Sequence, residues 1–286
     1  MKKIAISLYC AAAMFIGICS HAAAAETVAV IGTGDMGDSL GPRIASLGYR
    51  VIYGSRSPTS DRVEALVERS GVNASAATPL EAAQQADIVL LLVPWPAMET
   101  VAQSLGNLGG KILVDVSMPF EQDDDGYPKH MLETSSAEMI QAWNPGARVV
   151  KTFATIGSQV IDDPMAEGGL VTVPLASNDR AAKEKIAGIV AALGLDPVDF
   201  GPLRMARQIE SMQLIYMIPL AQNRPQSWEF FFRRSDHYGC YTSGTSTDEG
   251  LVPVYDAADL ADFPQHGEVP TPCPRAGNQE AMGRSP

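Results

Sequence analysis

The sequence predicts an α/β protein built on a doubly wound, mostly parallel sheet. Short apolar runs alternate with helix-length amphipathic stretches from residue 27 to about residue 222, which is the pattern of successive βαβ units. The runs at residues 87–93 (DIVLLLV) and 111–116 (KILVDV) are almost continuously apolar and rich in β-branched residues. Such runs are typical of strands that helices cover on both faces.

The individual elements follow from the same patterns. Strands are expected at residues 28–31, 50–53, 87–93, 111–116, 148–153, 170–175 and 197–200. Helices are expected at residues 36–47, 135–143, 178–193 and 205–221. Gly48 ends the first helix as its C-terminal cap, and Ser135 with Glu138 has capping-box spacing at the start of the second.

The N-terminus has the pattern of a secretory signal peptide. Lys2 and Lys3 precede an apolar stretch at residues 4–18, and a run of alanines at 22–25 ends before Glu26. We expect residues 1–25 to be removed, 26–234 to form one folded domain, and 235–286 to form an irregular, proline-rich extension. This places the mature protein in the periplasm or outside the cell. The alternative, an uncleaved anchor, needs an apolar run of ~20 residues.

The acidic composition restricts the classes of partner that the protein can bind. The chain has 21 basic and 33 acidic residues, a net charge of −12, and loss of the two leader lysines makes it more acidic. Such a surface repels nucleic acid and anionic lipid, so we expect a small-molecule partner and no membrane span after cleavage. The four histidines form no ligand pair, and Asp123–Asp125 lacks calcium-loop spacing, so no metal site is predicted. A homodimer is left open.

The cysteines carry a testable prediction. Cleavage of the leader leaves only Cys240 and Cys273, both in the proline-rich extension, and in an oxidising compartment two such cysteines are expected to pair. The closed loop would contribute roughly 3–4 kcal/mol by constraining the unfolded chain. Thiol titration of denatured, exported protein should find no free cysteine before reduction. Two titratable thiols in that sample would contradict the pairing.

A glycine-rich turn follows the first predicted strand. Residues 32–37 (GTGDMG) form a G-x-G-x-x-G between a strand and a helix, which is the context that a Rossmann-type dinucleotide site requires. Gly32 permits the tight turn, Gly34 lets a pyrophosphate approach the backbone, and Gly37 lets the helix pack on the strand. The phosphates are then expected on free N–H groups at the positive end of the helix. A glycine-rich turn without a ligand is the alternative.

The end of the second strand favours NADP over NAD. An NAD site usually has a carboxylate there to bind the ribose 2′-hydroxyl, whereas this chain has Ser55 and Arg56 after Gly54. An arginine–phosphate contact is worth roughly 1.5–3 kcal/mol, or about a 10- to 100-fold preference for NADP. A solvated surface arginine is the alternative interpretation.

Other predicted strand ends should meet the same crevice. Residues 93–96 (VPWP) either wall a ring-binding slot or form a rigid turn with a packed tryptophan, and the sequence does not decide between them. Residues 117–119 and 155–158 follow the next two strands of the crevice edge. No nucleophile elbow or acid–base constellation is visible, so no catalytic residue is predicted.

These motifs together resemble a known family. The segment 28–58 (VAVIGTGDMGDSLGPRIASLGYRVIYGSRSP) is similar to the N-terminus of the NADP oxidoreductases that depend on the deazaflavin coenzyme F420. The resemblance continues through LLLVPWPA, VDVSMPF, SSAEMI, RVVKTFATIGS and VDFGPLRMARQIESM and covers about residues 27–232. The reductase domain of the six-transmembrane metalloreductases is similar as well.

The resemblance implies hydride transfer between NADP(H) and a deazaflavin- or flavin-like acceptor. It implies the following cofactor contacts: Thr33, Gly34, Asp35 and Met36 along the pyrophosphate, Ser55 and Arg56 at the 2′-phosphate, and Val93, Pro94 and the Phe153–Ala154 segment on the nicotinamide side. Relatives often carry Asn where this chain has Ala154. Transfer between two rings needs mainly positioning, which agrees with the missing acid–base pair. The rival hypotheses are an imine or β-hydroxyacid reductase and an exported, non-catalytic nucleotide-binding protein.

Overall fold

The computed structural model describes residues 25–224, 227–232, 246–247 and 250–251. The chain divides into two compact units, residues 1–230 and 231–286. All of the predicted signal peptide except Ala25, both cysteines of the proposed disulfide and nearly all of the proline-rich extension lie outside the described residues. No described helix is both long and apolar enough to cross a bilayer.

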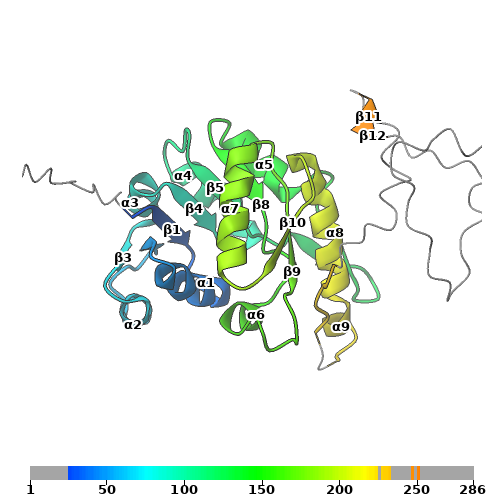
Figure 1. Ribbon diagram of the computed structural model, residues 1–286, viewed down its shortest axis with the longest axis horizontal. Helices are drawn as coiled ribbons and strands as arrows, with labels where there is room; N and C mark the ends of the chain where they lie inside the picture. The colour runs from blue at the N-terminus through cyan, green and yellow to red at the C-terminus, as the bar shows by residue number, and fades with distance from the viewer. Residues whose placement is uncertain (1–24, 225–226, 233–245, 248–249, 252–286) are drawn as a thin grey trace, which may run out of the picture. The chain divides into compact units, whose positions relative to one another are not determined.

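The first unit is built on a six-stranded, fully parallel sheet with the order β3-β2-β1-β4-β5-β8. Figure 1 labels β3, β1, β4, β5 and β8 of this sheet, with β3 at the left. Their bounds are β1 (Thr27–Ile31), β2 (Arg50–Gly54), β3 (Ala74–Ala77), β4 (Ile88–Leu91), β5 (Ile112–Asp115) and β8 (Arg148–Lys151). The order reverses between β1 and β4, which confirms the predicted doubly wound, Rossmann-type fold.

Helices cover both faces of this sheet, as the continuous apolar strands predict. One face is covered by α1 (Asp35–Ser46), α2 (Asp61–Ser70), α6 (Ser158–Asp162) and α7 (Arg180–Ala192). The other is covered by α3 (Pro79–Gln85), α4 (Trp95–Ser104), α5 (Ser136–Trp143), η1 (Leu203–Met205) and α8 (Ala206–Tyr216). Alternate residues of each strand enter the two cores, as the two-residue period of a strand requires: Val28 and Val30 of β1 pack on one side, Ala29 and Ile31 on the other.

Short elements complete the described chain. A parallel pair, β9 (Thr172–Leu175) and β10 (Asp196–Asp199), meets the end of β8 through a bridge between Lys151 and Ala176. The antiparallel hairpin of β6 (Phe120–Gln122) and β7 (Pro128–His130) lies between β5 and α5 in the sequence, and the exposed Asp123–Asp125 segment forms its turn. The second unit contains the small pair β11 (Ser246–Thr247) and β12 (Gly250–Leu251).

Element bounds differ from the prediction in two informative places. The expected strand at residues 148–153 ends at Lys151 because Phe153 has a φ of 58°, in the left-handed region that a strand cannot contain. The expected helix at 205–221 is divided at Met217 into α8 and α9 (Ile218–Ala221). Pro219 has no N–H to continue the hydrogen-bond ladder, which explains the break. The capping box of Ser135 and Glu138 is present as predicted.

Candidate functional site

A cleft of about 940 Å³ opens at the carboxyl ends of β1, β2, β4 and β5. Parallel strands of a doubly wound sheet present their ligand crevice at this edge, where the strand order reverses. The predicted site residues that line it are Gly32, Thr33, Gly34, Asp35, Met36, Ser55, Arg56, Val93 and Pro94. The fold therefore brings together residues from three strand ends that lie far apart in the sequence.

Two of the three glycines of the turn, Gly32 and Gly37, occupy places that a side chain could not share. Gly32 has a φ of 114°, and a Cβ there would lie 2.5 Å from the Leu92 carbonyl oxygen. A Cβ on Gly37 would lie 2.1 Å from the Gly32 oxygen, so Gly37 packs α1 directly behind the turn and is buried. Gly34 is different, because a Cβ there would meet no atom within 4 Å. The space beside Gly34 is thus open toward the cleft, where a phosphate can approach the backbone.

The N-terminus of α1 lies at this open space. Gly34 is its N-cap and no side chain caps the helix, so its first N–H groups are available for an anion. Two carboxylates lie in the first turn, and Asp38 is paired with Arg69 of α2 at 2.6 Å. This pair offsets part of the negative charge close to the proposed phosphate position.

Two arginines reach the cleft after β2. Arg56 follows Ser55, and Arg62 lies in the first turn of α2; both are exposed and line the cleft. Within the described part of the chain, neither guanidinium forms an ion pair with a carboxylate. Sequence reasoning identified Arg56 and missed Arg62. The sequence does contain a signal for Arg62, because it is a second basic residue shortly after the strand. The start of α2 places it beside the end of β2.

The opposite end of the cleft is mainly apolar. Beyond β4, Trp95 lines the cleft and also stacks on Trp143 of α5, with ring centroids 5.8 Å apart. Trp95 is thus both a packed residue and a wall of the cleft, so the packed tryptophan is confirmed, whereas binding of a ring in this slot stays a prediction. Met118, which the sequence places at the crevice edge, lines this end as predicted, together with Phe120 and Met131, which were not predicted.

Two of the predicted site residues do not line the cleft. Gly37 lies behind the turn, in the packing role described above. Ala154 is completely buried in the core between the sheet, α5 and α8. The left-handed backbone at Phe153 ends the extended course of β8, and the chain bends there into a buried turn at Ala154 and Thr155. Thr155 is buried in the same segment, whereas Ser117 after β5 does reach the cleft.

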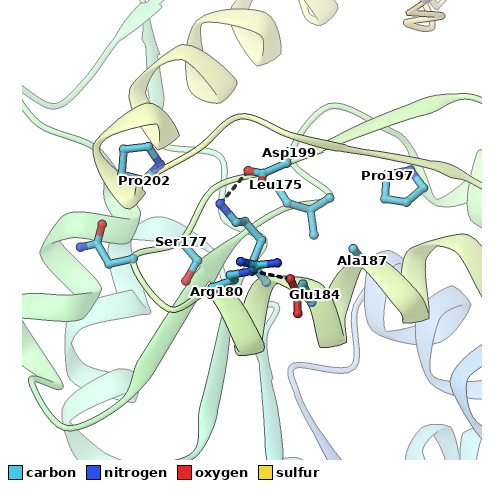
Figure 2. A pocket seen from close by; sticks show the side chains of 10 residues that line it. Leu175, Ser177, Arg180, Glu184, Ala187, Pro197, Asp199 and Pro202 are labelled. Carbon is cyan, nitrogen blue, oxygen red and sulfur yellow. Dashed lines mark hydrogen bonds and ion pairs between the residues drawn. The ribbon is translucent and has the colours of Figure 1, made fainter. Parts of the chain in front are cut away.

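A second cavity of about 530 Å³ lies between α7 and the β9–β10 pair. Figure 2 shows that its charged side chains are already paired, with Arg180 bound to Glu184 and the Lys183 ammonium bound to Asp199. Lys183 also donates to the Gly201 carbonyl at 2.9 Å. Because these cations have partners within the cavity, the cleft at the sheet edge is the stronger candidate site.

Comparison with known proteins agrees with this geometry. The family of coenzyme F420-dependent NADP oxidoreductases matches residues 27–119, which include the glycine turn and the strand ends of the cleft. An F420-dependent NADP reductase from Methanothermobacter thermautotrophicus is 32% identical over 201 residues, which cover 65% of this chain and 85% of the reductase. The chain belongs to this family. It is an NADP-dependent oxidoreductase.

The other similar proteins include a longer metalloreductase, a structure of matching length and an enzyme that shares only the fold. The rat metalloreductase STEAP3 is 28% identical over 192 residues, but the chain spans only 37% of that protein's length. A crystal structure of an Arthrobacter protein assigned to the F420-dependent NADP reductases has a TM-score of 0.64 and 29% identity, covering 72% of this chain and 99% of that one. An imine reductase from Myxococcus stipitatus, solved with NADP⁺, has 20% identity and a TM-score of 0.53 over 69% of this chain and 63% of that one, a likeness of fold alone.

Proposed function

We propose that this oxidoreductase transfers a hydride between NADP(H) and a deazaflavin- or flavin-like ring. The observation that carries the proposal is the division of the cleft into a cationic end and an apolar end. Of the residues that line it, the ionisable ones are Asp35, Arg56 and Arg62, and all three lie on the β1 and β2 side. The side beyond β4 and β5 offers no acid or base among its lining residues. Alcohol or hydroxyacid oxidation needs such a group.

The residues at the cationic end fit the adenosine half of NADP(H). The open space at Gly34 and the uncapped start of α1 suit the pyrophosphate. Arg56 and Arg62 suit the 2′-phosphate, because a guanidinium matches phosphate geometry with paired N–H donors. Ser55 fixes this loop: its Oγ accepts from the Ser57 N–H at 3.2 Å, and its own N–H donates to the Ala77 carbonyl.

The residues at the apolar end fit two flat rings. When bound, NADPH supplies the hydride, and solvent supplies the proton that the reduced acceptor takes up. The protein's task is then to hold the rings together and to exclude water. Trp95 provides a rigid wall fixed by its stacking on Trp143. Met118 and Met131 are adaptable, polarizable side chains that can pack on a ring face.

A substrate screen tests this function. We expect NADPH oxidation with F420, FMN or FAD as acceptor, and no NADP⁺ reduction with simple alcohols or hydroxy acids, because the apolar end lacks a general base. The measurement is the absorbance change of the nicotinamide with each substrate, including ferric chelates and cyclic imines. Robust turnover of an alcohol or hydroxy acid would overturn the flavin-like acceptor. Binding of NADPH without turnover of any acceptor would favour the non-catalytic alternative.

Export is a second, independent proposal. The basic start, apolar stretch and alanine run of the leader at residues 1–25 support it. N-terminal sequencing of protein recovered from the periplasm or medium should begin at about residue 26. Recovery of the chain only with Met1 intact inside the cell would refute export and leave the enzymatic proposal unaffected.

A further inference from the structure

A completely buried ionic cluster lies next to the cleft. The Lys151 ammonium, at the end of β8, is 3.0 Å from Asp115 Oδ2 at the end of β5 and 3.7 Å from Glu210 Oε1 of α8. Lys151 and Asp115 have no exposed side-chain surface, and Glu210 has almost none. Ser136, at the start of α5, joins all three through its hydroxyl. Buried charges are costly and a well-packed apolar group is often as stable, so the cluster calls for a further role.

This cluster holds both main-chain polar groups of Ser117. Asp115 Oδ1 accepts from the Ser117 N–H at 2.8 Å and from its hydroxyl at 2.5 Å. The Lys151 ammonium donates to the Ser117 carbonyl at 2.7 Å. Ser117 and its neighbours Val116 and Met118 line the cleft. The buried charges thus fix the backbone of one cleft wall from behind, without lining the cleft themselves.

Glu210 of α8 and Ser136 of α5 form hydrogen bonds and an ion pair with the Lys151–Asp115 pair and with each other. The Ser136 N–H donates to Glu210 Oε1 at 2.7 Å, and its hydroxyl lies 2.5 Å from Asp115 Oδ2. Burial raises the pKa of the Glu210 carboxyl, and the neighbouring Lys151 acts in the opposite direction.

We propose that Lys151 and Asp115 are positioning residues for the nicotinamide half of NADP(H), acting through the backbone of Ser117 and Met118. The proposal rests on the function proposed above for the cleft. The adenosine half fits the β1 and β2 side, so a dinucleotide that spans the switch point between β1 and β4 places its other half toward β5. The wall that Lys151 and Asp115 hold is at that end. A misplacement of about 1 Å at a reacting ring is enough to cost on the order of 100-fold in rate.

Binding of NADPH and of 2′,5′-ADP can be compared to distinguish a positioning role from a general effect on stability. Lys151→Met removes the ammonium and keeps the aliphatic stem. We expect NADPH to bind about tenfold more weakly, and kcat with any accepted ring to fall on the order of 100-fold. Binding of 2′,5′-ADP, which contains only the adenosine half and the 2′-phosphate, should stay within about twofold. Lys183→Met is the matched control, since Lys183 also pairs with a carboxylate and donates to a backbone carbonyl, but in the other cavity.

A milder variant keeps the test valid if Lys151→Met does not fold. Ser136→Ala deletes one oxygen from the cluster and does not alter a residue that lines the cleft. It should weaken NADPH binding more than 2′,5′-ADP binding, and amide hydrogen exchange in residues 115–120 should accelerate while that in residues 28–37 does not. Parallel loss of both ligands, or no change in either, would overturn the positioning role. These binding measurements need no acceptor, so they remain decisive even if the flavin-like acceptor is wrong.

Discussion

Gly34→Ala should weaken NADP(H) binding strongly while leaving the protein folded. The Cβ would meet no protein atom within 4 Å, and the backbone at Gly34 has a φ of −74°, which alanine adopts freely. Because the space it would fill is the one we propose for the pyrophosphate, charge-assisted hydrogen bonds to the backbone would be lost. Two of these are worth about 3 kcal/mol or more, so we expect the NADPH Kd to rise on the order of 100-fold. Isothermal titration calorimetry and thermal unfolding together measure both effects.

Alanine substitutions at two other glycines serve as controls for Gly34→Ala. Gly37→Ala places a Cβ 2.1 Å from the Gly32 oxygen, so binding and thermal stability should both fall. Gly188→Ala in α7 meets nothing within 4 Å and should leave binding unchanged, with a gain in stability of up to about 1 kcal/mol from helix propensity. Normal NADPH affinity in Gly34→Ala would mean that the cofactor does not bind at this turn. A large loss of stability in that variant would contradict the open space described beside it.

NADPH should bind at least about tenfold more tightly than NADH, because the guanidiniums of Arg56 and Arg62 lie where we propose the 2′-phosphate. Arg56→Ala should remove most of this preference, and Arg56→Ala with Arg62→Ala should remove what remains, with NADH binding nearly intact. Both side chains are exposed, so the preference should weaken as salt concentration rises. The measurement is the ratio of the two dissociation constants for each variant.

The control for this series is Arg180→Ala. Arg180 is also an exposed arginine, but it is paired with Glu184 and lines the other cavity. It should leave the NADPH to NADH ratio unchanged. Equal affinities of the wild-type protein for the two cofactors would refute recognition of the 2′-phosphate by this loop. If the preference for NADPH is lost in Arg62→Ala but not in Arg56→Ala, then Arg62 and not Arg56 recognises the 2′-phosphate.

The sequence by itself determined the parts of the site that depend on local geometry. The turn at residues 32–37 is recognisable because its glycines serve contacts within one strand–turn–helix unit, including that between Gly37 and the Gly32 carbonyl. Ser55 and Arg56 follow directly from their place at the end of β2. The alternation of apolar strands and helices was sufficient for the doubly wound fold, since burial on both faces of the strands leaves few other arrangements.

Only the tertiary structure decided the parts that depend on contacts between distant segments. Ala154 is buried and not at the cleft because it lies in a turn that follows the left-handed backbone of Phe153, a conformation that no local pattern signals. Arg62 joins the site because α2 starts beside the end of β2. Glu210 meets Lys151 and Ser136 only after α8 packs across α5 and the sheet. In the sequence these charged residues resemble any others, because burial and pairing are properties of the packed chain and not of its periodicity.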